Sequence, residues 1–209
     1  IDESTVKQVA GDNLRRFDKG GDAFYDQISA LHKSVRGSSP DASLYWLARM
    51  LDGGADPFYV ARRVVRMASE DIGNANPTAL VIANSTFQAV STIGYPESRI
   101  ILSQCAVYLA TSAKSNASYM AIGKAQQMVQ STGDLPVPLH LRNAPTKLMK
   151  DLDYGKEYKY SHDYSENFIA QEFLPDEIKN SRFYEPGNNP RENQFREILK
   201  KRWQSKYDY

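Results

Sequence analysis

Lysine and arginine are grouped in three places where their spacing would let them bind an anionic partner. Lys33 and Arg36 lie three residues apart, so on a helix they share one face. Arg62, Arg63 and Arg66 form a second cluster. The third lies near the end of the chain and mixes cations with aromatic rings: Arg196, Lys200, Lys201, Arg202, Lys206, Trp203, Tyr207 and Tyr209. Cations contact phosphates and rings stack on bases, so each cluster is a candidate nucleic-acid contact. A solvated helix face is the simpler explanation of each.

Nucleotide hydrolysis would need a glycine-rich phosphate loop with a lysine and a hydroxyl residue at fixed spacing. The two Gly-Lys pairs, Gly123-Lys124 and Gly155-Lys156, have neither the upstream glycine nor the following hydroxyl. We therefore predict no catalytic or cofactor-binding residue in this chain, and no ATP hydrolysis by it alone.

Metal and nucleophile chemistry is also not expected. The three histidines stand apart from one another, without a ligand spacing, at positions 32, 140 and 162. Cys105 lies in an apolar run, which favours a buried inert thiol over a nucleophile. Glu70 and Asp71 are adjacent carboxylates after an arginine-bearing segment. A structural ion pair or a helix cap is favoured there over a catalytic pair. No metal site is predicted.

The composition limits which other classes of partner and site are possible. The 209 residues carry 26 Lys and Arg against 25 Asp and Glu, a net charge of +1, so no strong global field attracts nucleic acid or an acidic partner. One cysteine excludes an intrachain disulfide framework and a multi-cysteine zinc site. The chain starts at Ile1 without a methionine or the apolar run of a signal peptide. We therefore expect it to be part of a longer protein.

The long uncharged stretch from Ile72 to Pro96 could be mistaken for a membrane span. Asparagine, serine, threonine and glutamine residues interrupt it, and Pro77 divides it. We interpret it as a helix buried on most sides at the centre of a helical domain, and we expect no membrane insertion.

Regularly spaced glycine, cap and proline residues predict the helices that must position these side chains. Gly-rich turns precede Ser39, Asp56 and Asn76, each of which can cap a helix, and each cap is followed by a proline suited to the first helical turn. Apolar residues recur at helical spacing around residues 24–35, 44–51, 60–72, 80–93, 100–109 and 119–129. The sequence therefore predicts an all-α fold. A compact bundle is favoured over a repeat array because successive helices differ residue by residue.

The character changes after Gly133. A short helix is predicted over Ala144–Leu152. Tyrosines are frequent beyond it, and we expect residues 153–190 to be an ordered, aromatic-rich irregular region that wraps over the bundle. A terminal helix is predicted over residues 191–206, with one shared face: Phe195, Ile198, Leu199 and Trp203.

Several segments form a recognisable set by their order and spacing: Ile28–Ser38 with its Lys-Ser-Val-Arg-Gly-Ser string, Pro40–Met50, Arg62-Arg63, Ala68–Gly73, Pro96-Glu97, Tyr108–Ala110, Lys114–Ala117, Val137–Asn143 and Tyr154–Tyr160. Together they resemble the replication-associated recombination protein A family, also called MgsA or RarA and related to the Werner-helicase-interacting proteins. One departure is Ser39, where the family leads us to expect an acidic residue, and both types cap helices.

The resemblance implies a C-terminal assembly domain of a clamp-loader-like AAA+ ATPase. Such proteins act at stalled replication forks and in recombination, and they bind DNA and single-strand-binding protein. Residues 1–19 would be the tail of the AAA+ lid, and residues 20–209 a helical domain similar to the clamp-loader collar, through which subunits form a homo-tetramer. The core that binds ATP and magnesium would precede this chain, and the location would be the bacterial cytoplasm, associated with the nucleoid.

The basic residues become candidate subunit-interface or DNA contacts under this resemblance: Lys33, Arg36, Arg62, Arg63, Arg66, Lys114, Lys200, Lys201 and Arg202. Arginine serves both roles, so the sequence leaves the choice open. The alternative is a stand-alone α-helical protein- or DNA-interaction module without an ATPase partner domain. A Walker motif upstream of Ile1 in the same reading frame would dismiss that alternative.

Overall fold

The computed structural model describes residues 4, 21–203, 206, 207 and 209. All regular secondary structure in these residues is helical, which confirms the predicted all-α class. The predicted lid tail, residues 1–19, lies outside the described residues except for Ser4, so the boundary near residue 20 stays a prediction. The chain divides into two compact units, Ile1–Asn116 and Ala117–Tyr209.

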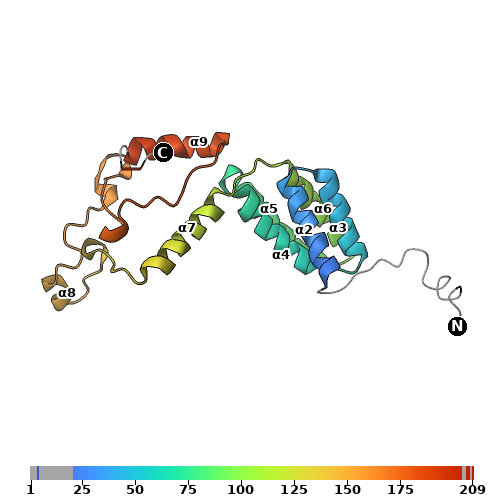
Figure 1. Cartoon of the computed structure of the whole chain (residues 1–209), viewed down its shortest axis with the longest axis horizontal. Coiled ribbons are helices and arrows are strands. Elements are labelled where there is room, and N and C mark those ends of the chain that lie inside the picture. The colour runs from blue at the N-terminus through green and yellow to red at the C-terminus, as the bar shows by residue number, and fades with distance from the viewer. Residues whose placement is uncertain (1–3, 5–20, 204–205, 208) are drawn as a thin grey trace. The chain divides into compact units, whose positions relative to one another are not determined.

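The first unit contains five α-helices among its described residues (Figure 1): α2 Asp22–Arg36, α3 Pro40–Asp52, α4 Pro57–Met67, α5 Thr78–Ile93 and α6 Ser98–Thr111. A π-helical turn, Ala68–Ile72, and a 3-10 turn, Gly73–Ala75, connect α4 to α5. Helix α2 packs on α3, α4 packs on α5, and α6 packs against both α3 and α5. The result is a bundle with short connections, as the glycine, cap and proline residues between the helices predict.

The caps decide where these helices begin. The Ser39 hydroxyl accepts the backbone N–H of Ala42 at 3.4 Å, and the Asp56 carboxylate accepts that of Phe58 at 3.0 Å. Both predicted caps are therefore confirmed. Asn76 is different, since its amide donates to the hydroxyls of Tyr108 and Ser112 on and after α6. It ties two segments together and does not cap α5.

The core of the first unit is continuous from α2 to α6. Its most deeply buried large side chains come from every helix except α5, and α5 contributes mainly small residues and Val90. They are Leu31, Met50, Met67, Ile72, Leu102 and Leu109. Small residues on α5 let the neighbouring helices approach closely, which is how a bundle reaches interior packing density.

The prediction that the uncharged stretch forms a helix buried on most sides is wrong. Helix α5 buries one face, through Ala79, Ala83, Thr86 and Val90. Its other face is exposed and includes Val81, whose relative accessibility is 64%. An uncharged stretch predicts burial, but here the uncharged residues also form an exposed helix face. No helix within the described ranges is long and apolar enough to cross a membrane.

The second unit contains α7 Ala117–Thr132, α8 Lys147–Asp151 and α9 Pro190–Trp203 (Figure 1). Short 3-10 turns occupy the connections: Leu139–Leu141, Ser161–Asp163, Ser165–Asn167 and Asp176–Ile178. Helix α8 is shorter than the predicted Ala144–Leu152 because Thr146 caps it, accepting the N–H of Met149 at 3.3 Å. Helix α9 begins one residue before the predicted 191 and is described as far as Trp203; residues 204 and 205, over which the predicted end at 206 would be judged, lie outside the described residues.

The aromatic-rich region over residues 153–190 is irregular with short turns, as predicted. Its rings pack on the end of α9, where Phe168 and Phe173 meet Trp203 edge-on, with centroids 5.4 and 6.4 Å apart. On the predicted apolar face of α9, Ile198 is exposed, whereas the other members are partly buried. That the region wraps over the bundle stays a prediction.

Candidate anion-binding groove

Helices α2 and α4 form a groove of about 320 Å³ that gathers four of the predicted contact residues. Lys33 and Arg36 reach it from α2, and Arg63 and Arg66 reach it from α4. Two predicted clusters that are far apart in the sequence therefore make one site. The remaining lining residues all come from α2: Tyr25, Ile28, Ser29 and His32.

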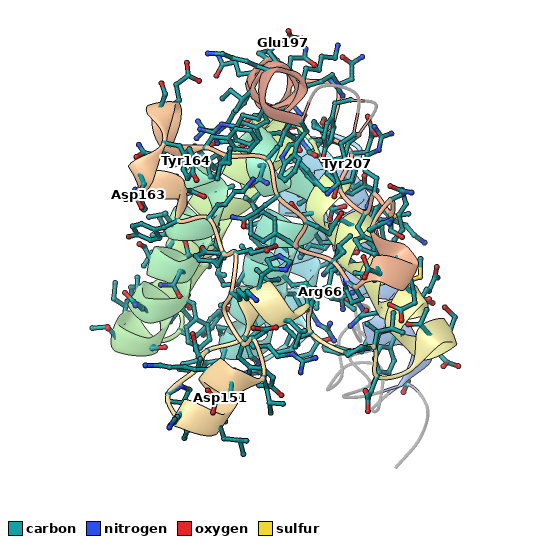
Figure 2. All side chains as sticks on the ribbon, turned by 90° about the vertical axis from the view of Figure 1, so that its left-hand side faces the viewer. Arg66, Asp151, Asp163, Tyr164, Glu197 and Tyr207 are labelled. Atoms are coloured by element: carbon teal, nitrogen blue, oxygen red, sulfur yellow. The ribbon has the colours of Figure 1, made fainter. Side chains whose placement is uncertain are left out.

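Two carboxylates hold the arginines of the groove in position. Asp71 accepts a hydrogen bond from Nε of Arg36 at 2.5 Å, and Glu70 accepts from Arg36 at 3.4 Å and from Nε of Arg66 at 2.7 Å. Glu70 thus bridges a residue of α2 and a residue of α4. This network confirms the structural ion-pair reading of the adjacent carboxylates, including the i,i+4 pair of Arg66 (labelled in Figure 2) with Glu70.

A tyrosine on α4 orders two more arginines. Arg63 lies over the Tyr59 ring at 4.9 Å from its centroid and donates to the Tyr59 hydroxyl at 3.0 Å. Arg62 lies 5.9 Å from the same centroid but does not line the groove.

Lys33 and Arg63 are the cations of the groove with no carboxylate within ion-pair distance in the part of the chain that the structure describes. Arg36 and Arg66 keep about half of their side-chain surface exposed while paired. The groove therefore presents four cations against two carboxylates that lie beneath them, since the Asp71 side chain is only 5% exposed. Its field attracts anions.

His32 lies in the wall of the groove between the charged groups. Burial lowers its pKa from the ordinary value of 6.5, the nearby carboxylates Asp71 and Glu70 oppose that shift, and Arg63 and Arg66 reinforce it. Its Nε2 atom is buried without a hydrogen-bond partner among the described residues. His32 is thus a neutral residue in a cationic site at neutral pH.

Lys114 lies in the segment after α6 and serves a different purpose. Its ammonium donates to the carbonyls of Ala110 and Ser112 at 2.9 and 2.6 Å, and to the Ser38 hydroxyl at 3.0 Å. A cation at the carboxyl end of a helix satisfies its last carbonyls and complements its dipole. Partial burial lowers the pKa of this ammonium. Lys114 therefore caps α6 and ties it to the turn after α2.

The cluster on α9 is largely neutralised by carboxylates of its own unit. Lys201 pairs with Glu166 at 2.6 Å, and Lys200 lies 3.8 Å from Glu197, which projects outward from α9 in Figure 2. The guanidinium of Arg202 lies 5.6 Å from the centroid of Phe168. These cations mainly fasten the aromatic region to the helix.

Cys105 and the histidines form no chemical centre. The Cys105 thiol is buried, and burial raises its pKa, so it is the inert thiol that the sequence predicts. The described part of the chain has no cluster of three His, Cys, Asp or Glu residues that could hold a metal ion. The sequence reasoning missed His32 and Tyr25 as groove residues. Their signal was the helical spacing of residues 25, 29, 32 and 36, which puts them on the face of the cations.

The fold and the groove together define an all-helical domain with a basic surface. The chain belongs to the family described as MgsA AAA+ ATPase C terminal, whose model matches residues 37–203, and the model described as AAA C-terminal domain matches residues 1–36. The family that the sequence motifs indicate is thereby confirmed.

Curated relatives agree with this assignment. Replication-associated recombination protein A of Coxiella burnetii is 58% identical over 200 residues, which cover 95% of this chain and 46% of that protein. The Escherichia coli K12 protein of the same name is 48% identical over 93% of this chain and 44% of its own length. ATPase WRNIP1 of Dictyostelium discoideum is 50% identical over 86% of this chain and 21% of its own length. The chain thus spans less than half of each of these relatives.

Proposed function

We propose that this chain is the C-terminal assembly domain of a clamp-loader-like AAA+ ATPase that maintains replication forks and acts in recombination. Support comes from the family and from relatives whose names state replication-associated recombination or an ATPase. The domain joins copies of the protein into a closed ring, a homo-tetramer by the resemblance, so that the ATPase cores are held in fixed register.

One observation carries the assembly role, namely the exposed apolar surface of the second unit. Helix α7 buries only Ala117, while Ile122 and Val129 are 57% and 61% exposed. Its sixteen residues contain a single charge, Lys124. A helix of this length is marginal in water by itself and gains stability by packing an apolar face. A second copy of the chain is the proposed cover.

The exposed face of α5 supports the same role. From Thr78 to Ile93 the helix has no charged residue, although Leu80 and Val81 are exposed. Solvated helix faces ordinarily carry charges, whereas protein interfaces are depleted of them at their centres. An uncharged exposed face is therefore suited to contact another protein surface.

ATP hydrolysis, DNA binding and the contact with single-strand-binding protein would be functions of the whole protein. ATP and magnesium would bind in the core that the relatives have and this chain does not span, so the chain itself would not catalyse hydrolysis. The complete protein would bind DNA and single-strand-binding protein and would work in the bacterial cytoplasm at the nucleoid. The competing proposal is a stand-alone helical interaction module, which an upstream Walker motif in the same reading frame would dismiss.

Light scattering of this chain at micromolar concentration tests the assembly role. We expect an oligomer, and we expect Ile122→Glu with Val129→Glu to give a monomer because charges cannot be buried unpaired in an interface. Gln127→Glu with Ser131→Glu is the matched control, since it adds the same charge to exposed polar positions on the opposite side of the same helix. A wild-type monomer, or equal loss of assembly in both variants, would contradict the proposal.

A further inference from the structure

We propose that the groove between α2 and α4 binds the phosphate backbone of single-stranded nucleic acid, with Tyr25 stacking on a base beside it. The groove lies wholly in the first unit, whereas the assembly role is carried by α7 of the second. The inference therefore assigns a binding site to this chain itself, independently of the ATPase core and of self-association.

Charge is the first argument. Lys33, Arg36, Arg63 and Arg66 line the groove, and the carboxylates that order two of them lie deeper. The carboxylates fix the guanidinium groups in place before a ligand arrives, which reduces the entropy lost on binding. Arginine forks match phosphate oxygens in geometry, and Lys33 adds a mobile point charge at the rim.

The length of the groove favours a nucleic-acid strand over a free anion as its ligand. The lining residues of α2 run from Tyr25 to Arg36, which corresponds to about 16 Å along the helix axis at about 1.5 Å per residue. One phosphate contacts only part of such a groove. A nucleic-acid strand places successive phosphates along it, so that cations at both ends contribute to binding.

An exposed ring at the edge of the groove selects single strands. Tyr25 is 57% exposed, and its ring meets Phe24 edge-on at a centroid distance of 5.7 Å, which limits its motion. Unpaired bases stack on such rings without sequence preference, whereas the bases of a duplex are already stacked. The combination of a cationic groove with an accessible ring favours a single strand over a duplex.

The basic helix α9 is the weaker candidate. Lys201 and Lys206 pair with Glu166 and Glu172 at 2.6 and 2.8 Å, and Trp203 is occupied by Phe168 and Phe173. A strand would have to break these contacts before binding. At Lys33 and Arg63 the described part of the chain has no ion pair for a strand to break, and Arg63 contacts the uncharged Tyr59 of its own helix.

Fluorescence anisotropy of the full chain with a labelled oligothymidylate at low salt tests the site. We expect Lys33→Gln with Arg63→Gln to weaken binding at least tenfold and to reduce the slope of log K against log salt by about 0.7 for each lost phosphate contact. The matched control, Lys200→Gln with Lys201→Gln, removes the same charge from α9 and should change affinity less than twofold. Equal losses, or a larger loss in the control, would overturn the assignment.

Two further measurements separate the ligand classes. Tyr25→Ala should weaken single-strand binding three- to tenfold and leave duplex binding unchanged, and an equal loss for both would overturn the stacking role. Inorganic phosphate at constant ionic strength should not displace the oligothymidylate below millimolar concentration. Displacement at lower concentration would identify a free-anion site and overturn the proposed backbone site.

Two variants separate a failure of strand binding at the groove from a failure of assembly. Light scattering of the Lys33→Gln, Arg63→Gln variant should give the wild-type mass, with an unchanged circular dichroism spectrum. The Ile122→Glu, Val129→Glu variant should lose assembly and keep its affinity per groove. If that monomer loses the oligothymidylate while the groove variant retains it, the strand binds across an assembly interface and the groove is not the site.

Discussion

Asp71 joins the turn after α4 to two other segments of the first unit. Its carboxylate accepts from Arg36 of α2, and its backbone carbonyl accepts the N–H of Ser115, which follows α6, at 2.8 Å. Beside it, Gly73 has a positive φ of 49°, and a Cβ there would lie 2.9 Å from the Ser115 carbonyl. The turn after α4 therefore has little freedom to rearrange.

Asp71→Ala should lower the free energy of unfolding by about 2 kcal/mol, because it removes a charged hydrogen bond from a nearly buried site. Arg66→Gln, which removes an exposed i,i+4 pair, should change the same quantity by no more than about 0.5 kcal/mol. Urea denaturation followed by circular dichroism measures both. Equal effects of the two substitutions would contradict the structural role of Asp71.

His32 should make the first unit sensitive to mild acid. Burial lowers its pKa from 6.5 in the folded state, so between those two values the unfolded chain binds more protons than the folded one. The free energy of unfolding therefore falls as the pH drops from 7 through 6.5 and on toward the lowered pKa. Asp71 and Glu70 oppose this shift, and Arg63 and Arg66 reinforce it.

Denaturation of the wild type and of His32→Gln between pH 7 and 5.5 measures the effect. The variant should lose less stability over this range, because glutamine does not titrate. Parallel pH profiles for the two proteins would show that His32 binds protons equally in both states, contrary to the expectation.

Among the elements, α9 depends on a buried cap at its first turn. Asn189 accepts the N–H of Glu192 at 3.0 Å and donates to its carboxylate at 2.6 Å, and the Tyr184 hydroxyl donates to the same carboxylate at 3.0 Å. The Glu192 side chain is fully buried. These hydrogen bonds replace the solvation that the carboxylate loses on burial.

Asn189→Ala should destabilise α9 by about 1–2 kcal/mol, since it removes the cap and a partner of a buried carboxylate. Hydrogen exchange of the α9 amides should accelerate, while exchange in α2 to α6 stays unchanged. Asn188→Ala, at the exposed neighbouring position, is the control. Unchanged exchange in α9 would mean that packing on the aromatic region holds the helix without its cap.

How far the sequence predicts these elements depends on the range of the interactions. The caps by Ser39 and Asp56 follow from local chemistry and are correct, because a cap contacts residues only two or three positions away. Asn76 has the same local signal, yet its partners lie 32 and 36 residues further along the chain. A partner at that separation is set by helix packing, which a single sequence does not specify.

The groove likewise combines local features that the sequence predicts with long-range packing that it does not. Helical spacing predicts that Lys33 and Arg36 share a face of α2, and that Arg63 and Arg66 share a face of α4. That these two faces meet depends on how α2 and α4 pack, and on Glu70, which pairs with both Arg36 and Arg66. The lack of charge in α5 was equally visible in the sequence, but a buried face and an interface face leave the same compositional signal.

At the scale of the whole molecule, the buried apolar side chains are distributed unevenly. Among the described residues, those of the hydrophobic core run from Phe24 to Leu109, and the second unit adds only Ala117 and Pro186 to the buried apolar residues. The first unit can therefore hold its fold through its own core. The second unit exposes many large apolar side chains, and under the assembly proposal another copy of the chain covers them.

This distribution predicts that the stability of α7 depends on protein concentration. Whatever binds the folded state adds to its stability by mass action, so self-association should protect the covered helix more at higher concentration. Hydrogen exchange of α7 amides should slow between low-nanomolar and micromolar protein, while exchange in α2 and α3, which carry no proposed assembly surface, stays constant. The Ile122→Glu, Val129→Glu variant should show fast α7 exchange at every concentration. Concentration-independent α7 protection in the wild type would mean that the helix is covered within one chain, and that its apolar surface does not drive assembly.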